Sequence, residues 1–529
     1  MKNFILALLS GFILALGWPT YGFPLLLFIG FVPLLLMEHR VRTSSVGWKK
    51  LVVFGYSYIG FVIWNYITTN WLQYADVFGA SFAILVNSFL MALMMVLYHS
   101  IAKRATRNIS LLFIICLWMA FEKLHLGWDF SWPWLNLGNG FSEYITWIQW
   151  YEYTGTFGGS LWVWLVNILI FKAVLTYRTA KSVQPLKKEG ILIVSLIVAP
   201  ILISLGIFHS YKMEGTPVNV IALQPNIDPY SEKYDVPNEA IADVLLKLTD
   251  TKINAKTDLV VAPETVFADN VKISQLEDMY FKRKLDVYLS EHPKTNLLTG
   301  ISFINFITDS AQIKEQSNKH SSGFWYDDYN SAMLLNQSDS VQLYHKSKLV
   351  VGVETLPYPE IIKPLIGDFM IDLGGTLAMK TTQDDREVFT TNNKNLMAAP
   401  IICYESVYGE FVTGYVRNGA TVLAIITNDA WWGDTEGHKQ HLSLARLRAI
   451  ETRRDIVRSA NTGISALINA KGEITSSLAY NTQGALSGTL TSNDKITFYT
   501  RAGDYIARIA MFVALFLFLI TMFRRSRVF

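Results

Sequence analysis

Apolar residues are distributed unevenly along the chain, and their spacing divides it into two kinds of segment. Long, almost uninterrupted apolar runs fill residues 1–210 and return at 505–523, whereas 216–500 alternates short apolar runs with longer amphipathic ones. A bilayer core about 30 Å thick requires roughly 20 apolar residues in a helix. The pattern therefore predicts a membrane protein with one sizeable water-exposed domain.

Eight windows are apolar enough to be predicted as transmembrane helices. They lie near 4–18, 21–37, 51–69, 81–102, 109–121, 155–176, 191–209 and 505–523. We expect the first to be retained rather than cleaved as a signal peptide, because a second apolar run follows it at once. The expected domains are a seven-helix membrane domain at 1–215, a water-exposed domain at 216–500, and a last transmembrane helix with a basic tail at 501–529.

Lysine and arginine cluster in alternate loops, and this pattern predicts the orientation in the membrane. The loop at 70–80 has none and the loop at 122–154 has only Lys123, whereas the intervening loops and both ends of the chain are basic. Basic loops stay in the cytoplasm, so we expect both termini there and the 216–500 domain outside it. A transport path would need ionisable groups within the helices; Glu122 and Arg508 lie near predicted helix ends, so transport is the less favoured function.

Composition agrees with this division. Over 529 residues, 51% are hydrophobic and 17% charged, against about 25% charged in a typical soluble domain. These values exclude a disordered chain, a collagen and a disulfide-rich secreted scaffold. The net charge of +3 is too small to indicate binding to nucleic acid.

The water-exposed domain has the pattern of an α/β protein. Strands are predicted at 218–223, 258–262, 296–301, 332–335, 397–403, 422–427 and 464–469, and helices at 237–250, 273–291 and 438–456. Strands separated by helices of this length indicate a layered α/β domain, and its length is sufficient for a core of its own.

Polar side chains follow three of the predicted strands. The strand 259–262 runs straight into Pro263-Glu264, Cys403 follows 399–402, and the segment 344–350 places lysines just before an apolar pair. Loops at the carboxyl ends of strands are where α/β folds place their chemistry. These loops are therefore the candidate site.

Cys403 is the candidate nucleophile of this site. The chain has two cysteines, and Cys116 lies in a predicted membrane span, so the two are not expected to pair even in a compartment that favours disulfides. A thiol needs a base or a charged neighbour to become nucleophilic. A glutamate can take its proton, and a lysine together with the backbone N–H of Tyr404 can stabilise an oxyanion.

This chemistry is acyl transfer through a thioester, but the spacing leaves the partners open. It does not choose Glu264 over Glu405 as the base, or Lys346 over Lys348 as the cation. His438 and His441 lie one helical turn apart without a pattern of partner carboxylates, so packing or hydrogen bonding is favoured over a metal there.

Three ordered motifs resemble the Glu–Lys–Cys motifs of the nitrilase superfamily. They are Pro263-Glu264-Thr265, the Tyr-x-Lys-x-x-Leu-Val sequence at 344–350, and Cys403-Tyr404-Glu405. The spans, the segment 427–433 and the helix at 440–451 are similar to those of the apolipoprotein N-acyltransferase family. The resemblance covers essentially the whole chain and implies an αββα sandwich for the outer domain.

The resemblance also implies a role for each matched residue. Glu264 would be the general base, Lys346 the electrostatic stabiliser and Cys403 the nucleophile. The supporting residues implied are Glu354, Glu405, Tyr404 and Tyr234, the last standing where the family usually has Trp. Lys348 stands where the family often has another residue, and we expect it to be solvated or lipid-facing.

The reaction implied uses no cofactor and no metal. Cys403 would take the sn-1 acyl chain of a membrane phospholipid and pass it to the α-amine of an S-diacylglyceryl-cysteine apolipoprotein, in the inner membrane of a bacterium with the catalytic domain facing the periplasm. The alternative is a membrane-anchored nitrilase-like amidase or hydrolase, in which water takes the acyl group. The apolar stretch at 356–379 is expected to form either a mobile membrane-dipping arm or an ordinary core excursion.

Overall fold

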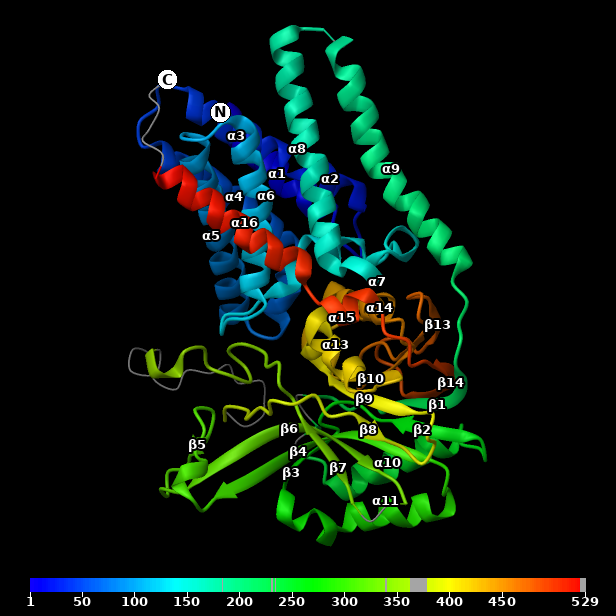
Figure 1. The fold of residues 1–529 in the computed structure, drawn as a ribbon. Helices are drawn as coiled ribbons and strands as arrows, with labels where there is room; N and C mark the ends of the chain where they lie inside the picture. Colours follow the sequence, from blue (N-terminus) through cyan, green and yellow to red (C-terminus); the bar gives the residue numbers. More distant parts are fainter. Residues whose placement is uncertain (183, 230–231, 234, 338–339, 362–377, 524–529) are drawn as a thin grey trace. The chain divides into compact units, whose positions relative to one another are not determined.

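The computed structural model describes the chain except residues 183, 230–231, 234, 338–339, 362–377 and 524–529 (Figure 1). The chain forms two compact units. One consists of Met1–Gln73, Val77–Tyr211 and Ala502–Phe529, and the other of Tyr74–Asp76 and Lys212–Arg501. Tyr234 and most of the expected arm at 356–379 lie outside the described residues.

The first unit consists of long apolar helices. In the described part of the chain, seven helical stretches are long and apolar enough to cross a membrane, namely Pro24–Thr43, Lys49–Tyr74, Val77–Ala102, Arg107–His125, Thr156–Ala180, Lys187–Ser210 and Tyr505–Phe523. A further apolar helix, α1 (Lys2–Leu16), has 15 residues and is shorter than these. The prediction of a multi-span helical domain is confirmed, whereas seven of the eight expected spans reach spanning length.

Glu122 explains why α6 (Arg107–His125) is longer than the apolar window at 109–121. The helix continues past Phe121, and the buried Glu122 carboxyl accepts hydrogen bonds from Trp118 Nε1 at 3.1 Å, Leu137 N at 2.8 Å and Ser160 Oγ at 2.6 Å. A buried polar group is tolerated when it is hydrogen-bonded in this way. Glu122 therefore ties α6 to α8 (Thr156–Ala180) and to the segment between them.

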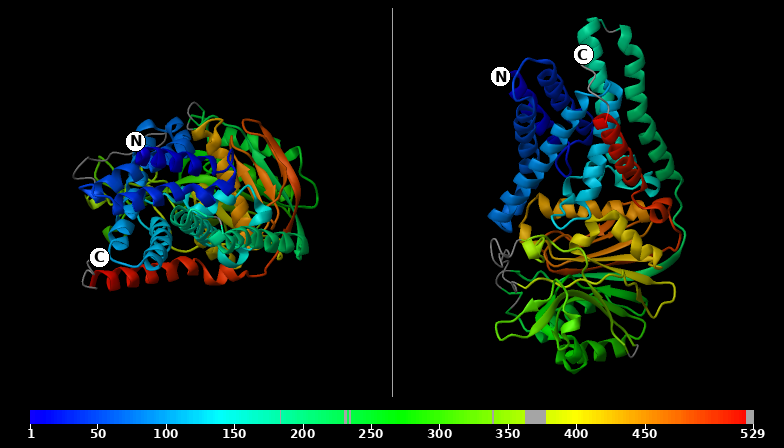
Figure 2. Two further views of the ribbon diagram at one scale, coloured as in Figure 1. Left: turned by 90° about the horizontal axis from the view of Figure 1, so that it is seen from above. Right: turned by 60° about the vertical axis from the view of Figure 1, so that its left-hand side comes forward.

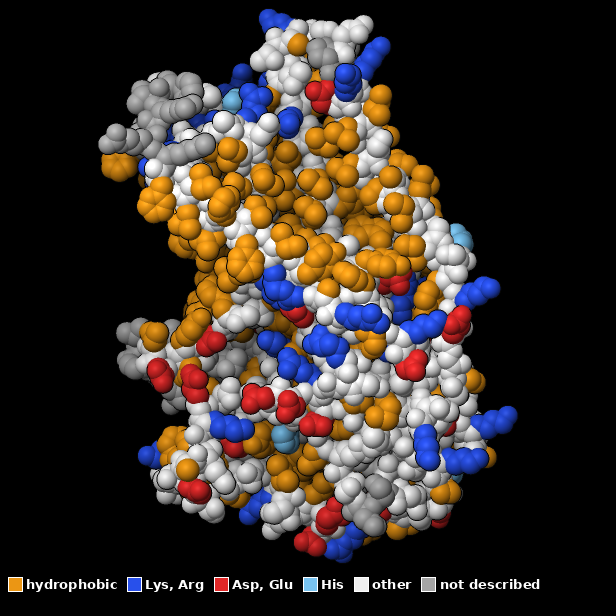
Figure 3. Space-filling view, in the orientation of Figure 1, with side chains coloured by type: hydrophobic (Ala, Val, Ile, Leu, Met, Phe, Trp, Pro, Cys, Tyr) orange, Lys and Arg blue, Asp and Glu red, His pale blue; other side chains and the backbone are white. Residues whose placement is uncertain are grey.

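The outer faces of these helices are apolar. Orange side chains cover this unit in the space-filling view (Figure 3). In α9 (Lys187–Ser210) only Ser204 is buried, while Ile191, Leu202 and Ile203 are more than half exposed. Apolar surface of this extent indicates contact with lipid rather than with water.

The second unit is an αββα sandwich, which confirms the expected fold (Figures 1 and 2). One sheet has the order β14-β1-β2-β4-β6-β5, with β3 beside β4 and β7 beside β6, and the other has the order β13-β12-β11-β10-β9-β8. Helices α10 (Asn238–Asp250) and α11 (Tyr280–Glu291) cover the outer face of the first sheet. Helices α13 (Gly409–Arg417) and α14 (Glu436–Thr452) cover that of the second.

The strands have the following bounds. The first sheet contains β1 (Thr216–Gln224), β2 (Thr257–Val261), β3 (Phe267–Lys272), β4 (Asn296–Ile307), β5 (Asn318–Lys319), β6 (Trp325–Leu335), β7 (Gln342–His345) and β14 (Gly484–Ser492). The second contains β8 (Phe389–Thr390), β9 (Met397–Ile402), β10 (Val422–Thr427), β11 (Ile456–Ala460), β12 (Ala466–Ile468) and β13 (Ile474–Ser477). All seven predicted strands are present.

Parallel pairing brings the candidate residues to one edge of the sandwich. In the first sheet β2 is parallel to both β1 and β4, and in the second β10 is parallel to both β9 and β11. Ile426 pairs with Ile402, and Thr427 with Ala460. Because the carboxyl ends of parallel strands lie on the same side, the loops after β2, β9, β10 and β11 come together.

Buried apolar side chains hold the first helical layer on its sheet. Ile241 and Leu245 of α10 and Phe281 and Leu285 of α11 belong to one core cluster with Val260 of β2. Each such side chain contributes about 1.5–3 kcal/mol when it is fully buried. This core fixes β2, and with it the loop that begins at the end of that strand.

Several predicted elements have other bounds in the structure, and three of these differences have a local cause. The helix at 273–291 is divided into a 3₁₀ turn (Ile273–Asp278) and α11, because Met279 between them is extended. Helix α14 begins after Thr435, whose side chain accepts from Gly437 N, and ends at Arg453, which is left-handed. The strand at 397–403 ends at Ile402, since Cys403 also has a positive φ.

Candidate active site

Cys403 lies on a sharp turn between β9 and α13. It begins a 3₁₀ turn (Cys403–Val407) with φ of 50°, a conformation that is uncommon for residues other than glycine and is often retained at functional sites. Ser406 Oγ donates to the carbonyl oxygen of Cys403 at 2.7 Å. The residue is 8% exposed, so the turn holds a nearly buried thiol in a fixed position.

Glu264 and Lys346 form a buried ion pair. Lys346 Nζ lies 2.9 Å from Glu264 Oε1 and 2.9 Å from Glu354 Oε1. Asn330 Nδ2 of β6 donates to the same two oxygens, at 2.8 Å and 3.0 Å. The second oxygen of Glu264 accepts from Asn428 N at 3.1 Å, just after β10. Each contact comes from a different part of the domain, namely from just after β7, from within β6 and from just after β10, so the fold of the sandwich positions this carboxylate.

The pair is ionised at neutral pH. Burial alone would raise the pKa of Glu264, but the Lys346 ammonium outweighs it and holds that pKa below its ordinary value. Burial would likewise lower the pKa of Lys346, yet the carboxylates of Glu264 and Glu354 raise it well above the usual range. A nearby opposite charge favours the charged form of each group.

The thiol of Cys403 is protonated at rest. Burial raises its pKa far above the ordinary value, the Glu264 carboxylate adds to this effect, and the Lys346 ammonium opposes it. The site therefore combines a neutral thiol with an ionised carboxylate and an ammonium. A thiol in this state needs a general base to become a nucleophile, and Glu264 is in the protonation state of a base.

Glu405, the other candidate base, occupies a different place. Its Oε1 accepts from Tyr344 Oη at 2.6 Å and Ser347 N at 2.7 Å, and its Oε2 accepts from Ile402 N at 2.8 Å. Burial raises the pKa of this carboxyl to about 7. Glu405 thus holds the turn of Cys403 against the segment that carries Lys346, while Glu264 and Glu354 contact the lysine itself.

The remaining sequence candidates lie around this centre. Tyr404 is buried with its ring edge-to-face against Tyr408, at a centroid distance of 5.2 Å. Lys348, expected to be solvated or lipid-facing, is half buried, and its ammonium lies 5.2 Å from the centroid of the same Tyr408 ring. The side chains of Lys346 and Lys348 therefore have different surroundings, and only Lys346 contacts the Glu264 carboxylate.

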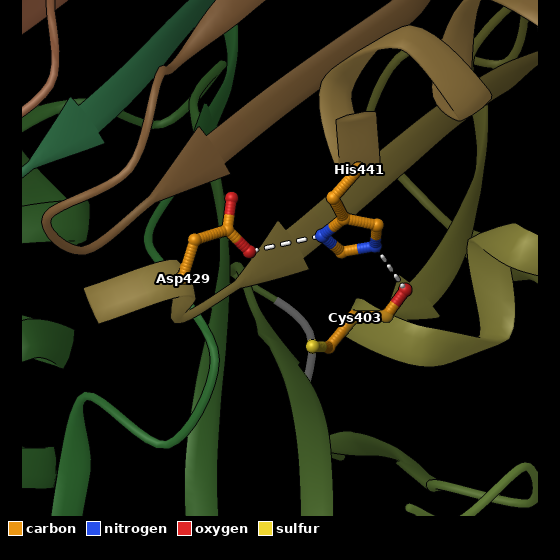
Figure 4. Close-up of side chains that lie close together, drawn as sticks. All are labelled: Cys403, Asp429 and His441. Carbon is orange, nitrogen blue, oxygen red and sulfur yellow. Dashed lines mark hydrogen bonds and ion pairs between the residues drawn. The ribbon is translucent and has the colours of Figure 1, made fainter. Parts of the chain in front are cut away.

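A buried aspartate–histidine pair supports the main chain of Cys403 (Figure 4). His441 Nδ1 lies 2.9 Å from Asp429 Oδ1, and His441 Nε2 lies 3.2 Å from the carbonyl oxygen of Cys403. Figure 4 shows the sulfur of Cys403 pointing away from the imidazole. The pair therefore contacts the backbone of the nucleophile and not its thiol, in agreement with hydrogen bonding as the expected role of His441.

Within the described part of the chain, Cys403, Asp429 and His441 also form a group whose side chains could in principle bind a metal ion. One ligand-type atom from each of Cys403, Asp429 and His441 lies within 4.8 Å of the others. However, the Arg458 guanidinium already donates to Asp429 Oδ2 at 2.6 Å. Arg458 supplies the positive charge beside this carboxylate, so the arrangement fits a hydrogen-bonded support better than a metal site.

The structure brings in residues to which the sequence assigned no role. Asn330, Asn428 and Asn461 donate hydrogen bonds within the site, and Lys233 lies beside it. Asn428 directly follows the predicted strand 422–427, so the same strand-end signal that identified Cys403 could have found it. Asn461 follows β11 (Ile456–Ala460), which the sequence analysis did not predict. Asn330 lies inside β6, where the sequence carries no comparable signal.

Sequence comparisons match both units. The family model described as the apolipoprotein N-acyltransferase N-terminal domain matches residues 10–169, and the carbon-nitrogen hydrolase model matches 307–496. An apolipoprotein N-acyltransferase of Chlorobaculum tepidum is 29% identical, over 99% of this chain and 97% of that protein. One of Geobacter metallireducens is 27% identical, over 96% and 92%.

One further relative supports the family assignment, whereas the similarity to a solved amidase structure does not. The apolipoprotein N-acyltransferase of Azotobacter vinelandii is 30% identical over 73% of this chain and 68% of that protein. A solved amidase from Nesterenkonia sp. AN1 aligns with a TM-score of 0.38 and 12% identity, over 55% of this chain and 99% of that one, a likeness too weak to support a conclusion. On the sequence matches to both of its units, the chain belongs to the apolipoprotein N-acyltransferase family.

Proposed function

We propose that the protein transfers the sn-1 acyl chain of a membrane phospholipid to the N-terminal α-amine of S-diacylglyceryl-cysteine apolipoproteins. Membership of the family supports the reaction class. The observation that carries the proposal is the ionised Glu264–Lys346 pair, whose charges act on the protonated thiol of Cys403. A base, a cation and a nucleophile on converging strand ends are what acyl transfer requires.

The first half of the reaction loads the enzyme. Glu264 takes the proton of Cys403 as the sulfur attacks the carbonyl carbon of the ester. The Lys346 ammonium and the backbone N–H of Tyr404 stabilise the oxyanion that develops. When the carbon–oxygen bond to glycerol breaks, Glu264 returns the proton to the leaving oxygen. The products are a lysophospholipid and a thioester on Cys403.

The second half transfers the chain to the acceptor. A neutral α-amine attacks the thioester carbon and gives a proton to Glu264, and the same two donors stabilise the second oxyanion. When the carbon–sulfur bond breaks, Glu264 protonates the departing sulfur. An amide forms and the free thiol is restored, so one carboxyl group acts alternately as base and acid. No step requires a cofactor or a metal.

The substrates imply a location at a membrane surface. Exposing an acyl chain to water costs about 0.8 kcal/mol per CH₂, so both lipids should reach the site from the bilayer. The basic loops of the helical unit favour an orientation with both termini in the cytoplasm. In a bacterial inner membrane the catalytic domain would then face the periplasm.

The test is mass spectrometry of the purified full-length protein after exposure to phospholipid. Without acceptor we expect one acyl adduct on Cys403 together with lysophospholipid, and with a diacylglyceryl peptide we expect the adduct to be discharged as an N-acylated peptide. Cys403→Ser should abolish both, and Glu264→Gln should slow loading by about 10²–10⁴-fold. Cys116→Ser, a buried cysteine of α6, is the matched control and should load normally.

Two outcomes would contradict the proposal. Acylation that persists in Cys403→Ser would remove the nucleophile from the mechanism. Steady release of fatty acid, unchanged by the acceptor peptide, would favour the membrane-anchored hydrolase, in which water discharges the same thioester.

A further inference from the structure

A second buried lysine, Lys233, lies beside the Glu264 loop. It belongs to the turn after β1, where its backbone N donates to Asp228 O at 2.9 Å. Asn461 fixes the start of this turn, accepting from Ile227 N at 3.0 Å and donating to Ile227 O at 2.6 Å. Lys233 is 6% exposed, so its side chain is enclosed by the sandwich although it comes from a loop.

The ammonium of Lys233 is held at a defined place. Its Nζ donates to Thr265 Oγ1 at 2.5 Å and lies 5.6 Å from the ring centroid of Trp431. Thr265 directly follows Glu264 and has φ of 43°, an unfavourable conformation for a β-branched residue. A hydrogen bond to the neighbour of the base and an aromatic face together fix the position of this charge.

The charges of the site balance only when Lys233 is included. Lys346 is shared between two carboxyl groups, those of Glu264 and Glu354. Lys380, which also faces Lys233, is in direct contact with Asp328 at 2.8 Å. One ammonium between two buried carboxylates leaves an uncompensated negative charge, which is costly in a protein interior. Lys233 supplies the second positive charge.

We propose that Lys233 is a positioning residue for acyl transfer: its ammonium, fixed by Thr265 and Trp431, keeps Glu264 ionised and thus available as the base. This inference rests on the proposed function. It is consistent with the direction of each pKa, because Lys233 is among the groups that lower the pKa of Glu264, while burial lowers the pKa of Lys233 itself to about 8.

Glu264 has direct polar contacts in addition to the nearby charge of Lys233. Lys346 from the end of β7, Asn330 from β6 and Asn428 from the end of β10 contact the carboxylate directly. The Cys403 thiol faces the same charges, together with Asp429. Replacing Lys233 leaves the direct contacts of Glu264 in place and removes a nearby charge.

The experiment compares three variants of the full-length protein. Lys233→Met removes both the charge and the hydrogen-bond donor, Lys233→Gln removes the charge but keeps a donor for Thr265, and Lys233→Arg keeps the charge. Loading of Cys403, followed as lysophospholipid release, is measured from pH 3.5 to 9 in short incubations, because the acceptor amine, with a pKa of about 8, would set the acid limb of the complete transfer. A second assay at pH 7 excludes irreversible unfolding. The rate of Cys403 alkylation by iodoacetamide is measured over the same range.

Loss of the Lys233 cation should raise the pKa of Glu264. The acid limb, meaning the part of each pH–rate profile where the rate falls because Glu264 becomes protonated, should therefore move to higher pH. We expect the limb of both profiles to shift by about one pH unit in Lys233→Met and Lys233→Gln, and to stay near the wild-type position in Lys233→Arg. A merely structural lysine would lower the rate at every pH and leave the limb in place. Lys233→Gln tests this even where Lys233→Met does not fold.

Two results overturn the inference: unshifted limbs in both neutral variants, or an equal shift in Lys233→Arg. The alkylation profile needs no lipid, so it separates this inference from the proposed function. A shifted alkylation limb in a protein that does not transfer acyl groups would support the role of Lys233 in keeping Glu264 ionised and would contradict the proposed reaction.

Discussion

At the scale of single residues, both oxygen atoms of the buried Asp429 carboxylate are engaged in polar contacts near Cys403. Its Oδ1 accepts from Thr427 Oγ1 at 2.7 Å and contacts His441, and its Oδ2 accepts from Arg458 at 2.6 Å. Gly463 packs so closely that a methyl group there would lie 2.7 Å from Oδ2. A residue with a side chain at position 463 would therefore displace this carboxylate.

We predict that Asp429→Asn destabilises the protein in a pH-dependent way. Breaking one partner of a buried ion pair costs about 3–5 kcal/mol, so the thermal midpoint at pH 7 should fall. Burial would raise the pKa of Asp429, but Arg458 and His441 hold it far below the ordinary value. Its contribution is thus complete above the unfolded-state pKa of about 3.9 and is lost as the pH falls below it.

The measurement is the thermal midpoint of the detergent-solubilised full chain at pH 7 and pH 3. The difference between wild type and Asp429→Asn should shrink at the lower pH. The matched control is Asp243→Asn. Asp243 is an exposed residue of α10 that pairs with Lys284 of α11, so its replacement should change the midpoint little at either pH. A difference of equal size at both pH values would show that the Asp429 charge does not act as described.

At the scale of elements, the loop that carries Glu264 crosses directly over β4. Gly300 N of that strand donates to Pro263 O at 3.1 Å. A side chain at Gly300 would overlap the backbone nitrogen of Thr265 and would lie 2.7 Å from the carbonyl carbon of Glu264. The contact atoms belong to the backbone, so the overlap can be relieved only by moving the loop.

We predict that Gly300→Ala lowers acyl transfer by about 100-fold, since a displacement near 1 Å in a catalytic group has an effect of this size. Gly484→Ala is the matched control in the same sheet, because a methyl group there would make an ordinary contact of 3.6 Å with Leu478. Initial rates of both variants give the comparison. A Gly300→Ala protein with the wild-type rate would show that the loop tolerates the shift.

The elements themselves were largely predictable, because they depend on periodicity. Buried strands such as β10 and amphipathic helices such as α10 repeat a simple pattern of apolar residues. The end of β9 at Ile402 was not predictable in this way. Glu405 accepts from Ile402 N, and its other partners are Tyr344, Ser347 and Tyr415, so a long-range network decides where the strand turns.

The site was predictable as motifs but not as a geometry. Glu264, Cys403 and the lysines of 344–350 could be selected as candidates from the ends of predicted strands, and their individual roles were implied by the resemblance to the nitrilase motifs. The choice between Glu264 and Glu405 required the distances to Lys346. Lys233 lies far from the other site residues in the sequence, and only the fold shows that its ammonium reaches Thr265.

At the scale of the whole molecule, the distribution of charge predicts the orientation that the proposed reaction requires. The helices α8 and α9 are joined by a basic segment, with Arg178 and Lys181 near the end of α8 and Lys187 and Lys188 at the start of α9. By the positive-inside rule this segment should lie in the cytoplasm. Because α9 is long enough to span a bilayer, the chain after it should emerge on the other side.

Reporter fusions test this orientation. Alkaline phosphatase, which needs an oxidising compartment, should be active when fused after residue 214 and inactive when fused after residue 182. Green fluorescent protein at the C-terminus should be fluorescent, since that end is expected in the cytoplasm. The reverse pattern of activities would place the catalytic domain in the cytoplasm and would exclude acylation of exported lipoproteins.

The pairing of β1 with β14 determines when the first sheet, which carries the Glu264 loop, is completed during synthesis. The two strands pair along their full lengths, from Thr216 with Ser492 to Gln224 with Gly484, so the first strand of the sandwich acquires this neighbour only after nearly all of the domain has been synthesised. Contacts between segments so distant in sequence form slowly. A chain synthesised only as far as Cys403 would contain Glu264 and Lys346 but lack β14. We therefore expect the first sheet, which carries the Glu264 loop, to be completed only when synthesis of the domain is almost finished.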